Sequence, residues 1–146
     1  MKDGFIRVAA ATPKIKVADP EYNAQQIIEL INQGYGRGVK LMVFPELCLT
    51  AYTCGDLFYQ SSLLLKAREE LARIISATKD RDILVFVGLP WEREDKLFNV
   101  AAVIQGGKLL GIVPKKHLPN YAEFYEARHF CPGNERPVFE IGRASC

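Results

Sequence analysis

The sequence lacks a long apolar run, and it lacks any block of charge of one sign. No segment approaches the ~18 consecutive apolar residues of a membrane-spanning helix, and the polar start at residues 1–4 does not resemble a signal peptide. Nineteen basic and seventeen acidic residues, spread along the chain, leave a formal net charge of +2. This charge pattern gives no reason to expect nucleic acid or a membrane as partner. We therefore expect a cytoplasmic protein.

Cysteine and histidine are also scarce. The four cysteines, Cys48, Cys54, Cys131 and Cys146, are irregularly spaced and match neither a disulfide framework nor paired zinc-ligand motifs. We therefore expect reduced thiols. His117 lies in a proline-bounded loop with no partner at metal-ligand spacing, so we assign it neither a metal nor a catalytic role.

What the chain does contain is the pattern of one α/β domain, with 49% hydrophobic residues in 146. Apolar runs rich in strand formers predict strands at residues 5–10, 40–44, 83–89, 97–105 and 109–113. Apolar residues at helical spacing predict amphipathic helices at residues 20–33 and 61–78. Gly106 and Gly107 separate the last two strands and indicate a two-residue hairpin. This order predicts a layered α/β fold with a mixed sheet.

Two charged residues follow predicted strands directly. Glu46 comes after the strand KLMVF and Pro45, where partial desolvation would suit a general base. Lys115 follows a strand and Pro114, where its ammonium would suit an oxyanion. Taken singly, each residue is equally compatible with a solvated side chain at a strand end.

Taken together, the segments around these residues resemble two signatures of the carbon-nitrogen hydrolase, or nitrilase, superfamily. The first is FPEL at residues 44–47, and the second is GIVPKKHLP at residues 111–119. The intervening hairpin, FNVAAVI and GKLLG, is also similar to the family's pattern. The resemblance implies a nitrilase-like αββα sandwich, of which residues 1–140 would form the first half to two thirds. It also implies a glutamate, lysine and cysteine triad, with Glu46 and Lys115 in the first two roles.

Within the superfamily, the segments that follow Glu46 and Lys115 are most similar to the glutaminase domain of glutamine-dependent NAD synthetases. This resemblance implies that Tyr52 and Tyr121 line a glutamine pocket and that Glu123 steadies the lysine. Ala51 stands where the resemblance leads us to expect glycine. The methyl group of alanine would tighten the turn if the position requires a positive φ. The alternative for the tyrosines and Glu123 is ordinary packing at the start of a helix.

The implied chemistry is the release of ammonia from glutamine. Glu46 would take the proton of a cysteine thiol, the thiolate would attack the amide carbon, and Lys115 would stabilise the oxyanion. The resemblance implies no cofactor for this domain. It implies ATP and Mg²⁺ for a downstream synthetase domain that uses the ammonia, together with self-association of the full protein.

The sequence shows no cysteine in the arrangement expected for the nucleophile. Cys48 and Cys54 flank Glu46 and suit packing, while Cys131 lies in a predicted loop. Residues 141–146 do not continue the expected pattern, so we interpret them as a non-native tail and the chain as an inactive fragment. Two alternatives stay open at this point: a free-standing amidase or carbamoylase of the superfamily, and a non-enzymatic interaction module.

Overall fold

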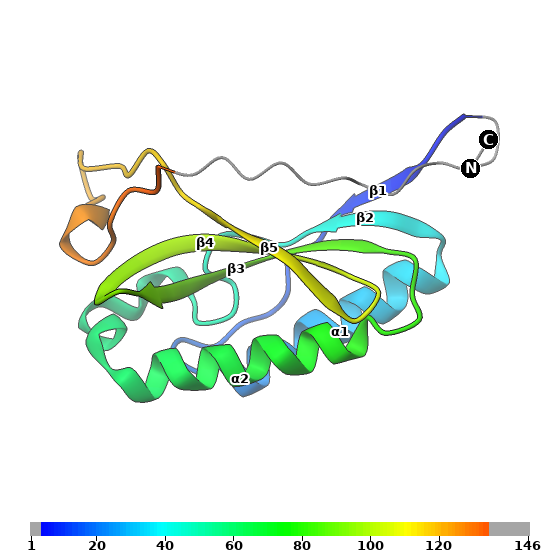
Figure 1. Ribbon diagram of the computed structural model, residues 1–146, viewed down its shortest axis with the longest axis horizontal. Coiled ribbons are helices and arrows are strands. Elements are labelled where there is room, and N and C mark those ends of the chain that lie inside the picture. Colours follow the sequence, from blue (N-terminus) through cyan, green and yellow to red (C-terminus); the bar gives the residue numbers. More distant parts are fainter. Residues whose placement is uncertain (1–3, 135–146) are drawn as a thin grey trace.

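A computed structural model of the protein describes residues 4–134, which form a five-stranded mixed sheet with two long helices (Figure 1). The sheet order follows the chain: β1 (Arg7–Ala10), β2 (Val39–Val43), β3 (Leu84–Arg93), β4 (Lys96–Gln105) and β5 (Lys108–Pro114). The β1, β2 and β3 strands pair in parallel, whereas β3, β4 and β5 pair antiparallel. The helices are α1 (Pro20–Gly36) and α2 (Ser61–Ala77). The order and mixed sheet expected from the sequence are confirmed.

Both helices pack on the same face of the sheet (Figure 1). Of the residues expected on the inner side of α1, Ala24, Ile27 and Ile31 are fully buried and Ile28 is half-buried. The inner residues of α2 lie against alternate residues of the central strands in the same core, including Val85, Val87, Val100, Ala102 and Ile104. Because successive strand residues point to opposite faces, the remaining residues of these strands face away from the helices.

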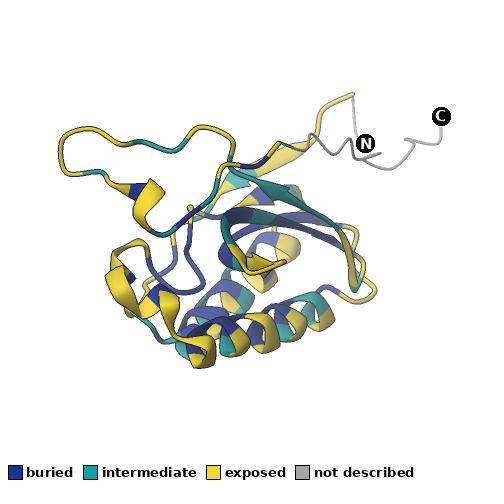
Figure 2. Cartoon of the chain, turned by 60° about the vertical axis from the view of Figure 1, so that its left-hand side comes forward, coloured by how far each residue is buried: buried dark blue, intermediate teal, exposed yellow. Residues whose placement is uncertain are grey.

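The opposite face of the sheet is only partly covered by the described residues, and several of its strand residues are half-buried or exposed (Figure 2). Val43 pairs with Phe86 in the sheet, and Ala101 pairs with Val113. Val43 is 43% exposed, and the other three are half-buried. This face is therefore a partly open apolar surface, in contrast to the helix side.

Local sequence accounts for how the elements begin and turn. Asp19 caps α1 by accepting a hydrogen bond from the Tyr22 backbone N–H at 3.0 Å, with Pro20 in the first turn. Gly106 and Gly107 have φ of 57° and 76°, as a hairpin turn of this length requires.

Two 3-10 helices were not expected from the sequence: η1 (Tyr52–Tyr59) follows β2, and η2 (Glu126–Arg128) follows β5. Within residues 4–134, no helix is long and apolar enough to cross a bilayer. The same residues contain no cluster of histidine, cysteine or acidic side chains that would hold a metal ion. The interpretation of residues 141–146 as a tail lies outside the described residues.

Candidate active site

Glu46 projects from a tightly built loop after β2, residues 44–51, which we call the glutamate loop. Its backbone is bound to β3 through the Phe44 N–H to Phe86 carbonyl bond (3.0 Å) and the Leu49 N–H to Gly88 carbonyl bond (3.1 Å). Every residue from Leu47 to Ala51 is buried. The Glu46 side chain itself is 41% exposed. The loop therefore fixes the backbone of Glu46 and leaves its carboxylate accessible.

The glutamate loop approaches β3 so closely that only glycine fits at position 88. A Cβ on Gly88 would lie 2.5 Å from the Leu47 backbone nitrogen and 2.5 Å from the Pro45 carbonyl oxygen. Both atoms belong to the backbone, so a side chain at position 88 would displace the loop. Gly88 is thus a positioning residue for Glu46.

Two non-glycine residues of this loop have positive φ. Leu47, directly after Glu46, has a φ of 50° and is fully buried. Ala51 has φ 76° and ψ 153°, in a region that is essentially restricted to glycine. The position where a glycine was expected therefore does require a positive φ, and the alanine methyl group strains this turn.

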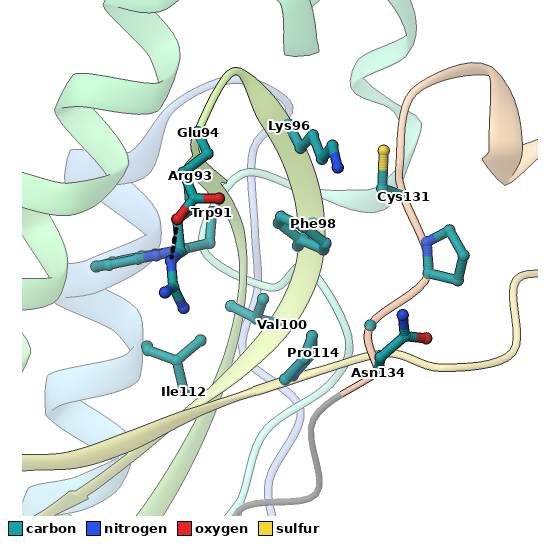
Figure 3. Close-up of a pocket in the computed structure, with 12 residues that line it drawn as sticks. Trp91, Arg93, Glu94, Lys96, Phe98, Val100, Ile112, Pro114, Cys131 and Asn134 are labelled. Atoms are coloured by element: carbon teal, nitrogen blue, oxygen red, sulfur yellow. Dashed lines mark ion pairs between the residues drawn. The ribbon is translucent and has the colours of Figure 1, made fainter.

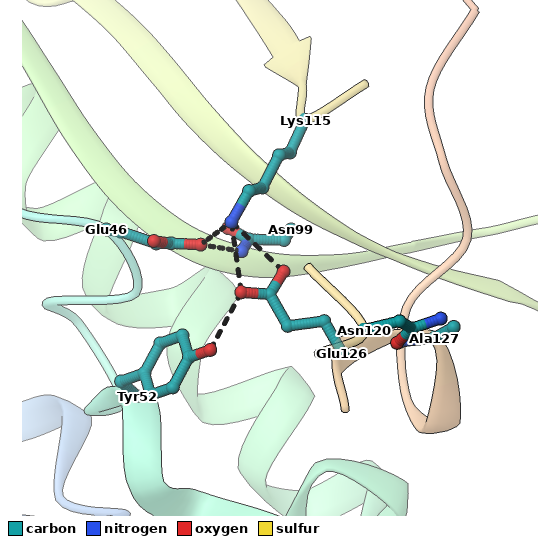
Figure 4. A network of polar contacts seen from close by, with 7 residues as sticks. All are labelled: Glu46, Tyr52, Asn99, Lys115, Asn120, Glu126 and Ala127. Atoms are coloured by element: carbon teal, nitrogen blue, oxygen red, sulfur yellow. Dashed lines mark hydrogen bonds and ion pairs between the residues drawn. The ribbon is translucent and has the colours of Figure 1, made fainter. Parts of the chain in front are cut away.

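Lys115 follows β5 and reaches across to Glu46. Its Nζ lies 2.7 Å from Glu46 Oε1, which confirms that the two residues meet at one end of the sheet (Figure 4). The Lys115 backbone N–H is bound to the Asn99 carbonyl at 2.8 Å, which continues the pairing of β4 with β5. The separation and common face expected for a catalytic pair are therefore present.

The second carboxylate on Lys115 comes from Glu126. Its Oε1 and Oε2 lie 3.0 and 3.1 Å from Lys115 Nζ, and the side chain is buried (Figure 4). Glu123, to which this contact was assigned, is exposed. This assignment needs correction, because the chain between Pro119 and Phe130 turns Glu126 inward. The Glu126 N–H binds the Pro119 carbonyl at 3.2 Å, and its own carbonyl accepts from Phe130 at 2.9 Å.

The two tyrosines differ in their contacts. Tyr52 donates a hydrogen bond from its hydroxyl to Glu126 Oε1 at 2.8 Å and so joins the cluster. Tyr121 is 69% exposed and packs edge-on against Phe124, which in turn packs edge-on against Tyr52. Tyr52 thus lies at the charged cluster, whereas Tyr121 lies on the surface beside it.

The cluster holds its groups in defined charge states. Burial lowers the pKa of Lys115, but hydrogen bonds and charge from Glu46 and Glu126 outweigh it and raise the pKa above its ordinary value. Burial and the hydrogen bond to Glu126 raise the pKa of Tyr52 far above its usual range. At neutral pH the site therefore contains the Lys115 ammonium and a neutral Tyr52 phenol, which donates to Glu126.

A hollow of about 310 Å³ opens beside this cluster on the sheet face that the helices leave free. Glu46, Asn99 and Lys115 form its polar edge. Its floor is apolar and comes from the open face of the sheet: Val43, Phe86, Ala101 and Val113. A small polar molecule could enter with its reacting group at the charged edge.

The described cysteines are poorly suited to act as the nucleophile of this cluster. Burial raises the pKa of the Cys48 thiol to about 12, and its sulfur faces the Gly88 carbonyl at 3.6 Å. Burial also raises the pKa of Cys54. Cys131 lines a different hollow, of about 680 Å³, together with Trp91 and Phe98 (Figure 3). None of the three lines the hollow beside Lys115.

With this geometry established, comparison with known proteins identifies the family. The sequence profile of the family described as "Carbon-nitrogen hydrolase" matches residues 7–146. The chain belongs to the carbon-nitrogen hydrolase family. The glutamine-dependent NAD(+) synthetase of Mycobacterium tuberculosis (strain H37Rv) is 39% identical over 142 residues, which are 97% of this chain and 21% of that protein.

Comparison with solved structures agrees with this assignment. The glutamine-dependent NAD+ synthetase of Acinetobacter baumannii superposes with a TM-score of 0.84 at 34% identity, over 92% of this chain and 25% of that one. An amidase from Nesterenkonia sp. has a TM-score of 0.78 at 23% identity, over 98% of this chain and 54% of that one, and shows a shared fold alone. The chain thus spans about a quarter or less of the synthetases it resembles, and the nitrilase-type α/β fold expected from the sequence is confirmed.

Three residues of the site escaped the sequence reasoning: Gly88, Asn99 and Glu126. Asn99 did leave a signal, since it interrupts an otherwise apolar run between Leu97 and Gln105. Glu126 left none that separates it from Glu123. Gly88 is recognisable only from the close approach of the glutamate loop.

Proposed function

We propose that this chain is the N-terminal part of a domain that hydrolyses glutamine in a glutamine-dependent NAD synthetase. The observation that carries the proposal is the Glu46–Lys115–Glu126 cluster beside an apolar hollow, in a chain whose relatives bear that name. In the whole protein, ammonia released here would feed the formation of NAD from deamido-NAD in a downstream domain. ATP and Mg²⁺ belong to that domain, and this part needs no cofactor.

Each residue of the cluster has a role that follows from its chemistry. Glu46 accepts the proton of a cysteine thiol, and the resulting thiolate attacks the amide carbon of glutamine. Lys115, held 2.7 Å from Glu46, presents a fixed ammonium to the oxyanion that forms. The proton on Glu46 passes to the leaving ammonia, and Glu46 then activates the water that releases glutamate from the thioester.

Glu126 serves Lys115 and not the substrate. It is buried, and both of its oxygens contact the ammonium, so it orients Lys115 and balances its charge. Tyr52 fixes Glu126 in turn through its hydroxyl. We propose that Tyr52 and Tyr121 border the route by which glutamine enters, with Tyr52 nearer the charged cluster.

We propose that none of the four cysteines of this chain is the nucleophile, so the 146-residue chain alone should release no ammonia from glutamine. We also propose that the full protein works in the cytoplasm and self-associates. Robust ammonia release by the isolated chain, abolished by substitution of Cys48 or Cys54, would show that the nucleophile has been misplaced.

The decisive experiment compares two nitrogen donors in the full-length protein. Glu46→Gln keeps the shape of the side chain but removes the proton acceptor, and Lys115→Met removes the ammonium. Both should abolish glutamine-dependent NAD formation and preserve ammonia-dependent NAD formation. Glu29→Gln, an exposed carboxylate on α1, serves as the control and should preserve both. Equal loss with both donors would make Glu46 structural, and unchanged glutamine use would remove it from the mechanism.

A further inference from the structure

Asn99 binds both members of the candidate catalytic pair at once. Its side-chain amide donates to Glu46 Oε1 (Figure 4), and its backbone carbonyl accepts from the Lys115 N–H at 2.8 Å. It is 3% exposed and lies on β4, next to β5, the strand that precedes Lys115. A buried polar side chain in an apolar strand requires a partner, and here that partner is a carboxylate.

The two hydrogen bonds to Glu46 fall on the same oxygen. Asn99 Nδ2 and Lys115 Nζ both donate to Oε1, and within residues 4–134 nothing donates to Oε2. An ionised carboxylate has lone pairs on both oxygens, and donors on one of them fix the orientation of the group. Oε2 is thereby left as the oxygen with free lone pairs.

We propose that Asn99 is a positioning residue that pins Oε1 of Glu46 and reserves Oε2 to receive the thiol proton. This inference rests on the proposed function, since it assigns the base to one atom of Glu46. The transfer is complete as written: the S–H bond breaks, its proton binds Oε2, and the electron pair stays on sulfur. The ammonia that leaves later takes this proton away, so no further reactant is needed.

An amide is the group that suits this position. Its NH₂ donates to a carboxylate without adding charge, so it leaves Lys115 as the cation closest to Glu46. A carboxylate at position 99 has no hydrogen to donate to Glu46, and it would compete with Glu46 for Lys115. A lysine or arginine at position 99 would place a second cation beside Glu46, in addition to the Lys115 ammonium that stabilises the oxyanion.

The test uses Asn99→Leu, which keeps the approximate volume and the backbone bond to Lys115, in the full-length protein. Loss of a hydrogen bond to a charged group predicts a fall in kcat for glutamine hydrolysis of about 10- to 100-fold, with little change in KM. Ammonia-dependent NAD formation should be unchanged. Asn99→Asp, equal in size, should lose at least as much and decides the question if the leucine variant fails to fold.

Two controls separate positioning from general damage. Thr78→Val removes a buried hydroxyl that binds the Ile75 carbonyl and the Gly107 N–H, at the hairpin turn. It should lower stability without a selective loss of glutamine use. The second control is the double variant Asn99→Leu/Glu46→Gln. Its active-site thiol should react with iodoacetamide no more slowly than the thiol of Glu46→Gln alone, because Asn99 acts through Glu46.

The outcomes distinguish this inference from the function on which it rests. If the wild type uses glutamine and Glu46→Gln does not, the proposed function stands. Under those conditions, a kcat of Asn99→Leu and Asn99→Asp within about twofold of wild type overturns the positioning role alone. The positioning role is also overturned if the two substitutions lower the rate of thiol alkylation additively in the double variant. A wild type that releases no ammonia from glutamine overturns both proposals.

Discussion

The two carboxylates that hold Lys115 come from regions built in opposite ways. The glutamate loop is buried from Leu47 to Ala51 and is hydrogen-bonded to the central strand β3. The stretch that carries Glu126, residues 115–134, which we call the lysine segment, has mostly exposed or half-buried residues. Most of its backbone bonds are local, such as Phe124 to Tyr121 and His129 to Glu126. The glutamate loop is therefore fixed by the core of the domain, whereas the segment that carries Glu126 is held by a few polar contacts and by the packing of Phe130 against Phe58.

This difference has a physical consequence for each region. The glutamate loop cannot move without disturbing β3, because Gly88 leaves no space between them. The lysine segment can separate locally at the cost of its ion pair, the Tyr52 hydrogen bond and the packing of Phe130 against Phe58. Local opening of the site should therefore start on the Glu126 side.

The largest contrast should be seen in thiol reactivity, since each region contains a cysteine. Cys48 in the glutamate loop has a pKa raised by burial from 9.0 to about 12, so its thiolate population at pH 8 is roughly a thousandfold below that of an ordinary thiol. Cys131 in the lysine segment is half-buried. Iodoacetamide labelling followed by peptide mass spectrometry should modify Cys131 long before Cys48. Comparable labelling rates at neutral pH would contradict the rigidity of the glutamate loop.

The same raised pKa sets the direction of a pH dependence. A thiol whose pKa is higher in the folded state than in the unfolded state contributes stability that is complete below about pH 9. That contribution is lost as the pH rises from 9 towards about 12. Substitution of Cys48 by alanine should therefore flatten the alkaline fall in the free energy of unfolding across this range.

Gly88→Val tests the close approach of the glutamate loop to β3. The added side chain meets backbone atoms, so the unfolding free energy should fall by about 3 kcal/mol or more. Gly36→Ala is the matched control, because a Cβ there meets nothing within 4 Å. Urea denaturation measures both variants. A loss below about 0.5 kcal/mol for Gly88→Val would mean that the loop can move away from the strand.

Glu126→Gln tests the lysine segment. Loss of the carboxylate on Lys115 should cost about 1–2 kcal/mol, and the effect should be local. Hydrogen exchange read by mass spectrometry should rise in the lysine segment and stay unchanged in the glutamate loop. Glu123→Gln, an exposed carboxylate in the same segment, should leave exchange as in the wild type. Faster exchange in Glu123→Gln together with unchanged exchange in Glu126→Gln would restore Glu123 as the partner of Lys115.

The smallest effect should come from Ala51→Gly at the end of the glutamate loop. Glycine relieves the positive φ of 76°, although it also increases the entropy of the unfolded chain. The balance should raise the unfolding free energy by about 1 kcal/mol. Alanine substitution at Gly133, whose Cβ would lie 2.4 Å from the Pro114 side chain, should lower it instead.

The sequence alone determined the order of the elements and the mixed sheet. These features depend on apolar periodicity and on proline and glycine at the ends of elements, all of which are local. The pairing of Glu46 with Lys115 was implied only by the resemblance of the two segments to the carbon-nitrogen hydrolases. The signal was strong for α1 and α2, because each has an apolar stripe several turns long.

Only the tertiary structure decided which glutamate reaches Lys115, why position 88 is glycine, and what Asn99 binds. Glu123 and Glu126 lie three positions apart in an irregular segment, where no repeating period fixes the direction of a side chain. The roles of Gly88 and Asn99 depend on contacts with a loop more than thirty residues away. Such contacts are set by how the layers pack, and no local pattern in the chain encodes them.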